Sequence, residues 1–102
     1  MPANLDRAPE LVADLTLYST GRGGRTHPIR DGYGCPCYPS GDRSAGGWDA
    51  RVLLGDEPMF PGQSRRVGFV FLSGSKAAEL MRSAGRFYLW EWKDIGEAVV
   101  VD

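Results

Sequence analysis

Glycine and proline divide this chain into short segments, and that punctuation limits what it can fold into. The 102 residues include 14 glycines and 7 prolines. Between them lie runs in which residues of two faces alternate, the pattern of a strand with one buried side. Residues 10–19 are the clearest case, because Leu11, Ala13, Leu15 and Leu17 recur at every second position. Short strands at this spacing predict an all-β domain.

Five further strands are expected, at residues 32–39, 48–55, 64–73, 85–92 and 94–102. A long loop, 20–31, precedes the first of them, and a tight turn near Lys93 joins the last two. Pro36 has no backbone N–H to donate to a neighbouring strand, which predicts an edge strand or a bulge there. The run 64–73 is apolar on both faces, which is typical of a central strand.

One segment, residues 75–85, has the pattern of a helix, with Ser75 as its N-cap and Gly85 at its end. Pro61 and Gly62 suit the central positions of a type II turn. The length predicts one domain, with an N-terminal arm at 1–9 and the folded unit at 10–102. Six short strands fit a closed barrel or a sandwich, and closure would remove exposed edges.

The charge balance gives no general signature of a nucleic-acid-binding protein. The net charge is −1, and the only lysines are Lys76 and Lys93. Positive charge is therefore local and mostly arginine. The sequence shows neither a run of apolar residues long enough to span a membrane nor a signal-peptide pattern. We therefore expect a soluble, cytoplasmic protein with no membrane partner.

Cys35 and Cys37 are the only cysteines. On a strand, positions i and i+2 point to the same face, and a disulfide between them would oppose normal geometry. Two thiols and the single histidine, His27, fall short of a four-ligand zinc site. We expect two small strand residues, with no metal and no cofactor. A redox or metal role, or a Cys/His nucleophile, stays open as the alternative.

Several motifs follow one another in a recognisable order. The chain reads GGR over 23–25, then Pro28, GY over 32–33 and Tyr38. Further on it reads FPGQ over 60–63, GRFYLWE over 85–91, and G-x-A-V-V over 96–100. This order resembles the C-terminal β-barrel, domain III, of the translation elongation factor Tu family, which reads GGRHTPFF, GYRPQFY, MPGDN and GLRFAIREGGRTVGAGVV. The resemblance covers most of the chain, about Leu15 to Val101, and implies a six-stranded antiparallel Greek-key barrel.

In that family the barrel packs on the GTPase domain, meets the exchange factor Ts and touches the T stem of aminoacyl-tRNA. The resemblance implies that Arg25 matches the arginine of GGR, whereas Thr26 stands at the family's histidine and His27 follows it. The family's RPQ falls on residues 34–36, which here read GCP. The chain has no G-x-x-x-x-G-K-[ST], so we expect no nucleotide binding and no GTPase activity.

The loop beginning at Gly21 is a candidate site for an anion or an RNA backbone. Its glycines permit left-handed backbone, so that successive N–H groups can form an anion-binding nest. Side-chain donors suited to phosphate come from Arg22, Arg25, His27 and Arg30. The alternative is that the glycines only shape a long loop, in which the arginines are solvated or paired with aspartates.

The segment GRFYLWEW is the candidate protein interface. Period two places Phe87 and Leu89 on the core face, and Tyr88, Trp90 and Trp92 on the opposite face. Three large aromatics on an outer face are typical of a contact surface, because Trp and Tyr often anchor protein interfaces. They can also stack on unpaired bases. The alternative is that the N-terminal arm or the helix covers them.

These features favour a non-catalytic binding module for a protein partner, in the translation machinery or as a mimic of the factor's third domain. An RNA-binding, tRNA-binding module that uses the arginine and glycine loop is the first alternative. An immunity or decoy protein that mimics the elongation factor domain is the second. An enzyme is the least favoured reading, since no catalytic constellation can be argued from the residues.

Overall fold

The structure, a computed structural model, describes residues 8–40 and 46–102. Each strand lies inside a range predicted from the sequence, and the strands are β1 (Leu11–Leu17), β2 (Tyr33–Tyr38), β3 (Trp48–Leu53), β4 (Ser64–Phe71), β5 (Arg86–Trp90) and β6 (Asp94–Val100). A 3-10 turn, η2 (Thr20–Arg22), lies in the predicted long loop, and the helix α1 (Ser75–Ala84) joins β4 to β5.

The strands form a closed antiparallel barrel in the order β1-β4-β3-β2-β5-β6, and pairing of β6 with β1 closes it. The expected barrel is therefore confirmed, and the sandwich alternative is wrong. β4 lies between β1 and β3, as its apolar character predicted. Its outward residue Val70 is fully buried, like the inward-facing Phe69 and Phe71.

Alternating residues of all six strands fill the barrel. Three phenylalanines from β4 and β5 meet at its centre, where the ring centroids of Phe69 and Phe87 are 5.0 Å apart in an edge-on arrangement and Phe71 lies 6.2 Å from Phe87. Edge-on aromatic pairs add to the hydrophobic stabilisation that their burial provides. Both cysteines of β2 point into this core, on one face as predicted.

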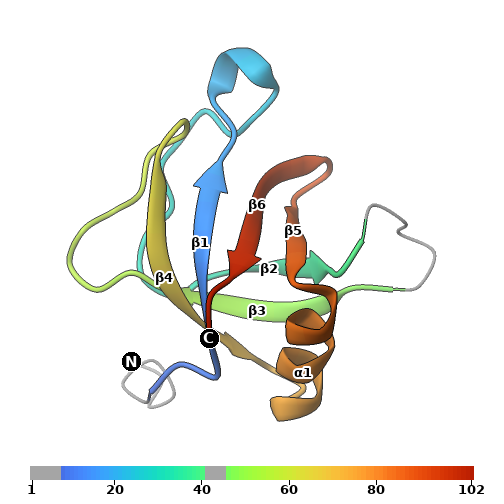
Figure 1. Ribbon diagram of the computed structural model, residues 1–102. Coiled ribbons are helices and arrows are strands. Elements are labelled where there is room, and N and C mark those ends of the chain that lie inside the picture. Colours follow the sequence, from blue (N-terminus) through green and yellow to red (C-terminus); the bar gives the residue numbers. More distant parts are fainter. Residues whose placement is uncertain (1–7, 41–45) are drawn as a thin grey trace.

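The barrel has two differently built ends, which we call the helix end and the loop end (Figure 1). At the helix end, α1 turns Ala77, Ala78 and Met81 into the core. The predicted N-cap, Ser75, is wrong by one residue: Gly74 is the N-cap, and its φ of 87° is a conformation that glycine adopts without strain. Gly85 ends the helix in the left-handed conformation, as predicted.

At the loop end, the segment 18–32 contacts both the segment 54–63 and the β5–β6 hairpin. Ile29 and Met59 exchange two backbone hydrogen bonds of 2.9 Å and are both buried over the core. The side chain of Asp31 accepts bonds from the N–H groups of Leu54 and Gly55, at 2.7 and 3.1 Å. These contacts tie two loops, distant in sequence, across the mouth of the barrel.

The predicted type II turn is supported by two observations. Gly62 has a φ of 92°, and the Gln63 N–H donates to the Phe60 carbonyl at 3.1 Å. Of the predicted N-terminal arm, residues 1–7 lie outside the described part. Pro9 lies so close to β4 that a side chain at Gly68 would bring its Cβ 2.6 Å from the Pro9 Cβ.

Pro36 does not make β2 an edge strand, so that alternative of the prediction is wrong. β2 pairs with β3 over five residues and with β5 over two, Cys37 with Leu89 and Tyr38 with Tyr88. Residues of an antiparallel ladder face their two neighbours alternately, so Pro36 faces the same side as Tyr38, toward β5. Because it has no N–H to donate, the β2–β5 pairing stops there. We call this short contact the β2–β5 seam.

Candidate functional site

Two aromatic residues project from the outer face of β5. Tyr88 and Trp90 are half-buried, whereas the alternating residues Phe87 and Leu89 are fully buried in the core. This part of the predicted alternation is therefore confirmed. With Trp92, these residues form what we call the aromatic surface (Tyr88, Trp90 and Trp92). It lies on β5 and the hairpin that follows, at the loop end of the barrel.

Trp92 reaches this surface by a different route from the predicted one. A register shift at Leu89 and Trp90 ends the regular pairing, so that Trp92 lies in the hairpin turn and not on the strand. It is the only residue other than glycine with positive φ in the described part of the chain, at 63°. Its side chain is 88% exposed, and its ring centroid lies 6.1 Å from that of Trp90.

A non-glycine residue in the left-handed region carries strain, and such strain persists only where surrounding contacts over-determine it. A large indole held in water is also unfavourable for the isolated molecule. Both features occur at one residue, and the neighbouring ring of Trp90 extends the exposed apolar area. The arrangement is therefore suited to contact with another molecule.

The flank of the aromatic surface is polar and hydrogen-bonded. Tyr88 lies opposite Glu97 of β6 in the sheet. The Glu97 carboxylate accepts from the Tyr18 hydroxyl at 3.1 Å and from Arg86 at 3.3 Å. Burial, followed by the bond to Glu97, raises the pKa of Tyr18. This network gives the apolar area a defined border on its β6 side.

The predicted anion site separates into two groups. Arg22, His27 and Arg30 are exposed, Arg22 in the 3-10 turn and the other two further along the loop. Arg25 instead turns into the protein, and its side chain is only 20% exposed. The structure therefore does not bring all four predicted residues to one anion site.

Arg25 has a set of partners that the sequence did not reveal. Its guanidinium donates to the Glu91 carboxylate, to the Tyr33 hydroxyl at 3.3 Å and to the His27 carbonyl at 3.1 Å. It also lies 4.9 Å from the centre of the Tyr33 ring, a cation–π contact. Glu91 is 66 positions away in the sequence, so no local pattern could have indicated this pairing.

The electrostatics of this group favour the charged pair. Burial lowers the pKa of Arg25, but the hydrogen bond to Glu91 and the nearby Tyr33 outweigh it, and the net shift is upward. Burial raises the pKa of Tyr33, and the proximity of Cys35 and Glu91 adds to the shift. Arg25 therefore stays a cation and Tyr33 a neutral phenol at physiological pH.

The glycines of this loop serve local backbone structure in different ways. A Cβ at Gly24 would lie 2.0 Å from the carbonyl oxygen of Tyr18, so only glycine fits there. Gly23, with φ of 91°, ends the 3-10 turn. The Gly24 N–H donates to the Ser19 carbonyl at 2.9 Å. These contacts fix the backbone just before Arg25.

The two thiols lie apart from both candidate surfaces. Cys35 is 6% exposed and Cys37 is fully buried. The hydrogen bond to Cys35, followed by burial, raises the pKa of Cys37. His27 is exposed in its loop, and the described residues contain no cluster of three or more metal-ligating side chains. They also contain no helix long and apolar enough to cross a membrane.

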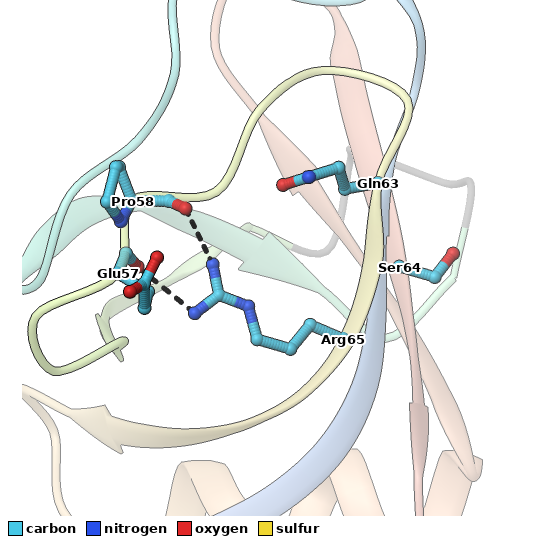
Figure 2. A pocket seen from close by; sticks show the side chains of 5 residues that line it. All are labelled: Glu57, Pro58, Gln63, Ser64 and Arg65. Carbon is cyan, nitrogen blue, oxygen red and sulfur yellow. Dashed lines mark hydrogen bonds between the residues drawn. The ribbon is translucent and has the colours of Figure 1, made fainter.

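A shallow polar hollow of about 390 Å³ lies beside the start of β4 (Figure 2). Its lining residues are Glu57, Pro58, Gln63, Ser64 and Arg65. Figure 2 shows Arg65 reaching across it to the loop, where its guanidinium donates to the carbonyls of Glu57 and Pro58 at 3.0 and 2.8 Å. Arg65 therefore has a structural role in this hollow, since it holds the loop against β4.

No protein-family model matches this sequence, and no curated protein matches it.

Proposed function

We propose that this protein is a non-catalytic binding module and that the aromatic surface docks a protein partner. The observation that carries the proposal is Trp92, which is 88% exposed and held beside Trp90 by a hairpin in a strained conformation. Tryptophan and tyrosine dominate the energetic centres of protein interfaces, where they fill pockets on the partner. A hairpin already held in its bound conformation would lose little conformational freedom on binding.

The closed barrel shapes how a partner would bind. No strand edge of the described barrel is left for a partner to extend by a full strand, since each strand has two neighbours. Side chains therefore supply the contact. The proposal assigns no chemistry to His27 or the cysteines, because the histidine is exposed and both thiols lie in the core.

We also propose that the barrel is a Greek-key barrel of the elongation factor Tu domain III kind. The strand order supports this, since β2, β3 and β4 are successive neighbours and β1 lies beside β4. The motif order in the sequence is the other support. A role in translation and a cytoplasmic location are part of this proposal. An immunity or decoy protein that mimics the elongation factor domain is the alternative role for the same barrel.

RNA is the second candidate ligand. The exposure of Arg22, His27 and Arg30 favours it, because their side chains can reach phosphates. The engagement of Arg25 by Glu91 leaves this candidate with fewer cations than the sequence offered. Exposed tryptophans would add stacking to such a contact.

The test begins with capture of partners from native lysate and continues with purified components. A captured protein is prepared pure and titrated by calorimetry against wild type, Trp92→Ala and the control Leu72→Ala, whose side chain is 52% exposed after β4. We expect Trp92→Ala to weaken binding by at least about tenfold, as for an interface anchor, and Leu72→Ala to leave it unchanged. Equal affinity of wild type and Trp92→Ala would contradict the proposal.

A parallel arm titrates tRNA and single-stranded RNA at two salt concentrations. Salt-sensitive binding that Arg22→Gln and Arg30→Gln reduce would favour the RNA alternative over the protein partner.

A further inference from the structure

The Trp92 hairpin stands next to the weakest contact of the barrel wall. β2 and β5 pair over two residues, whereas β5 pairs with β6 over five. The part of β2 that precedes Cys37, residues 33–36, runs toward the loop end and has no partner position on β5 or the hairpin. Gly34 is exposed in this part. Regular backbone pairing therefore fixes the hairpin on its β6 side, but not on its β2 side.

Side chains bridge this gap. Arg25 joins Tyr33, at the start of β2, to Glu91, the residue directly before Trp92. A guanidinium offers donors in a rigid planar fork, so it can hold several acceptors in one geometry. Here the acceptors come from β2, from the hairpin and from the loop carbonyl of His27. We call this group the latch (Arg25, Tyr33 and Glu91).

The latch itself is anchored from behind. The Thr20 hydroxyl donates to the Arg25 carbonyl at 2.6 Å, and the tight fit of Gly24 against Tyr18 fixes the preceding peptide. Arg25 is thus held at its backbone before its side chain crosses the gap. Its side chain is 20% exposed and that of Glu91 40%, so solvent screens the ion pair only in part.

The turn beyond Glu91 has a single internal bond, from the Glu91 N–H to the Lys93 carbonyl at 2.8 Å. Trp92 lies inside this three-residue turn, with its strained φ of 63°. When the carboxylate of Glu91 is fixed from outside, the backbone that carries Trp92 has fewer conformations to explore. The direction of the exposed indole then depends on Arg25.

We infer that Arg25 is a positioning residue for the aromatic surface: through the latch it holds the hairpin in the conformation that presents Trp92 beside Trp90. The inference rests on the proposed function for its biological meaning. It concerns the conformation of the aromatic surface before a partner binds. Arg25 need not touch the partner. Binding energy otherwise used to order the hairpin is then available as affinity.

The experiment reads the hairpin without any partner. Indole N–H resonances of Trp90 and Trp92 and amide exchange of residues 91–93 are followed by NMR in wild type, Arg25→Gln, Arg25→Lys and Glu91→Gln. We expect Arg25→Gln and Glu91→Gln to shift both indole signals and to speed exchange in the turn about fivefold or more. Arg25→Lys retains the charge but not the fork, so a partial return toward wild type is expected.

Arg22→Gln is the matched control, since it removes an exposed cation three positions earlier in the same loop. It should leave the indole signals and the exchange rates unchanged. The inference is overturned if Arg25→Gln keeps wild-type signals and exchange, or if Arg25→Lys disturbs the turn as strongly as Arg25→Gln does. Loss of the whole spectrum in Arg25→Gln would also contradict it, by showing a general role in folding.

A second measurement separates this inference from the proposed function. If Trp92→Ala leaves partner affinity unchanged, the proposed function fails, while the effect of Arg25→Gln on the hairpin can still be observed. If Trp92→Ala weakens binding but Arg25→Gln does not, the surface is real and its positioning by Arg25 is wrong. Weakening by both, about fivefold for Arg25→Gln, supports the two together.

Discussion

The two ends of this barrel are closed by different arrangements of the chain. At the helix end, one continuous segment turns Ala77, Ala78 and Met81 into the core. At the loop end, charged side chains join the segment 18–32 to two segments far from it in sequence: Asp31 binds the backbone of Leu54, and Arg25 binds Glu91 of the hairpin. Apolar closure is insensitive to exact direction, whereas hydrogen bonds hold a defined geometry. The end that carries the candidate site is thus the one where hydrogen bonds fix the orientation of the chain segments.

The largest effect is expected at the helix end. Met81→Ala removes a fully buried side chain and leaves a cavity, which lowers the free energy of unfolding by about 2–5 kcal/mol. Leu80→Ala, one position earlier and 39% exposed, should lower it by less than about 1 kcal/mol. Urea unfolding measures both. Equal losses would show that α1 does not close the barrel through this face.

At the loop end, Arg65→Met keeps the aliphatic stem but removes two hydrogen bonds and leaves the carbonyls of Glu57 and Pro58 without their donor. We expect a loss of about 1–2 kcal/mol in the free energy of unfolding. The matched control is Arg66→Met, the next residue of β4. Its exposed ion pair with Asp14 should contribute no resolvable stability in the same urea titrations. A larger loss for Arg66→Met would reverse the comparison.

A pH titration isolates the latch from the rest of the loop end. An unfolded tyrosine loses its proton near pH 10, whereas native Tyr33 keeps it to higher pH, because burial raises its pKa. Above about pH 10 the unfolded state therefore binds fewer protons than the native state, and the free energy of unfolding falls as pH rises. Tyr33→Phe removes this contribution, so its stability should fall less steeply.

Urea unfolding of wild type and Tyr33→Phe between about pH 9 and 11 measures the two slopes. Tyr18→Phe is a useful second variant, because burial and Glu97 raise the pKa of Tyr18 on the outer face. Removing either tyrosine should flatten the slope, and removing both should flatten it further. Parallel slopes for wild type and Tyr33→Phe would contradict the assignment of Tyr33 as a buried neutral phenol.

The strands could be predicted from the sequence because each is a local pattern. Alternation placed Leu11 through Leu17 and the pair Phe87 and Leu89 correctly, since side chains of a strand point to opposite faces in turn. Closure into a barrel depends on pairing between distant strands, and the residues alone left barrel and sandwich open. The motif order pointed to a barrel, which the strand pairing confirms.

The candidate site was predictable only in part. Period two predicts that Trp92 lies on the strand, because alternation carries no information about where pairing stops. The register shift at Trp90 moves Trp92 into a turn. Spacing groups Arg25 with Arg22 and Arg30. Its engagement by Glu91 depends on where the hairpin meets the loop, which is a property of the closed barrel.

The smallest expected effect concerns the two thiols, which report on the β2–β5 seam from inside the barrel. Cys37 lies opposite Leu89 in the paired part of the seam, whereas Cys35 lies toward its unpaired end. Both are buried, so a thiol reagent reacts only when the structure opens. Single-cysteine proteins, Cys37→Ala and Cys35→Ala, let each thiol be followed separately.

If the latch closes the unpaired end of the seam, Arg25→Gln should speed labelling of Cys35 and leave that of Cys37 unchanged. Loss of about 1 kcal/mol corresponds to about a fivefold rise in the opening equilibrium, which sets the size of the expected effect. Each rate is compared with the same thiol in the presence of Arg25, because the pKa of Cys37 is raised and slows its reaction independently. Equal acceleration at both thiols would mean that Arg25 stabilises the barrel as a whole. The contacts of the loop end would then differ from those of the helix end in chemistry, but both would stabilise the whole barrel.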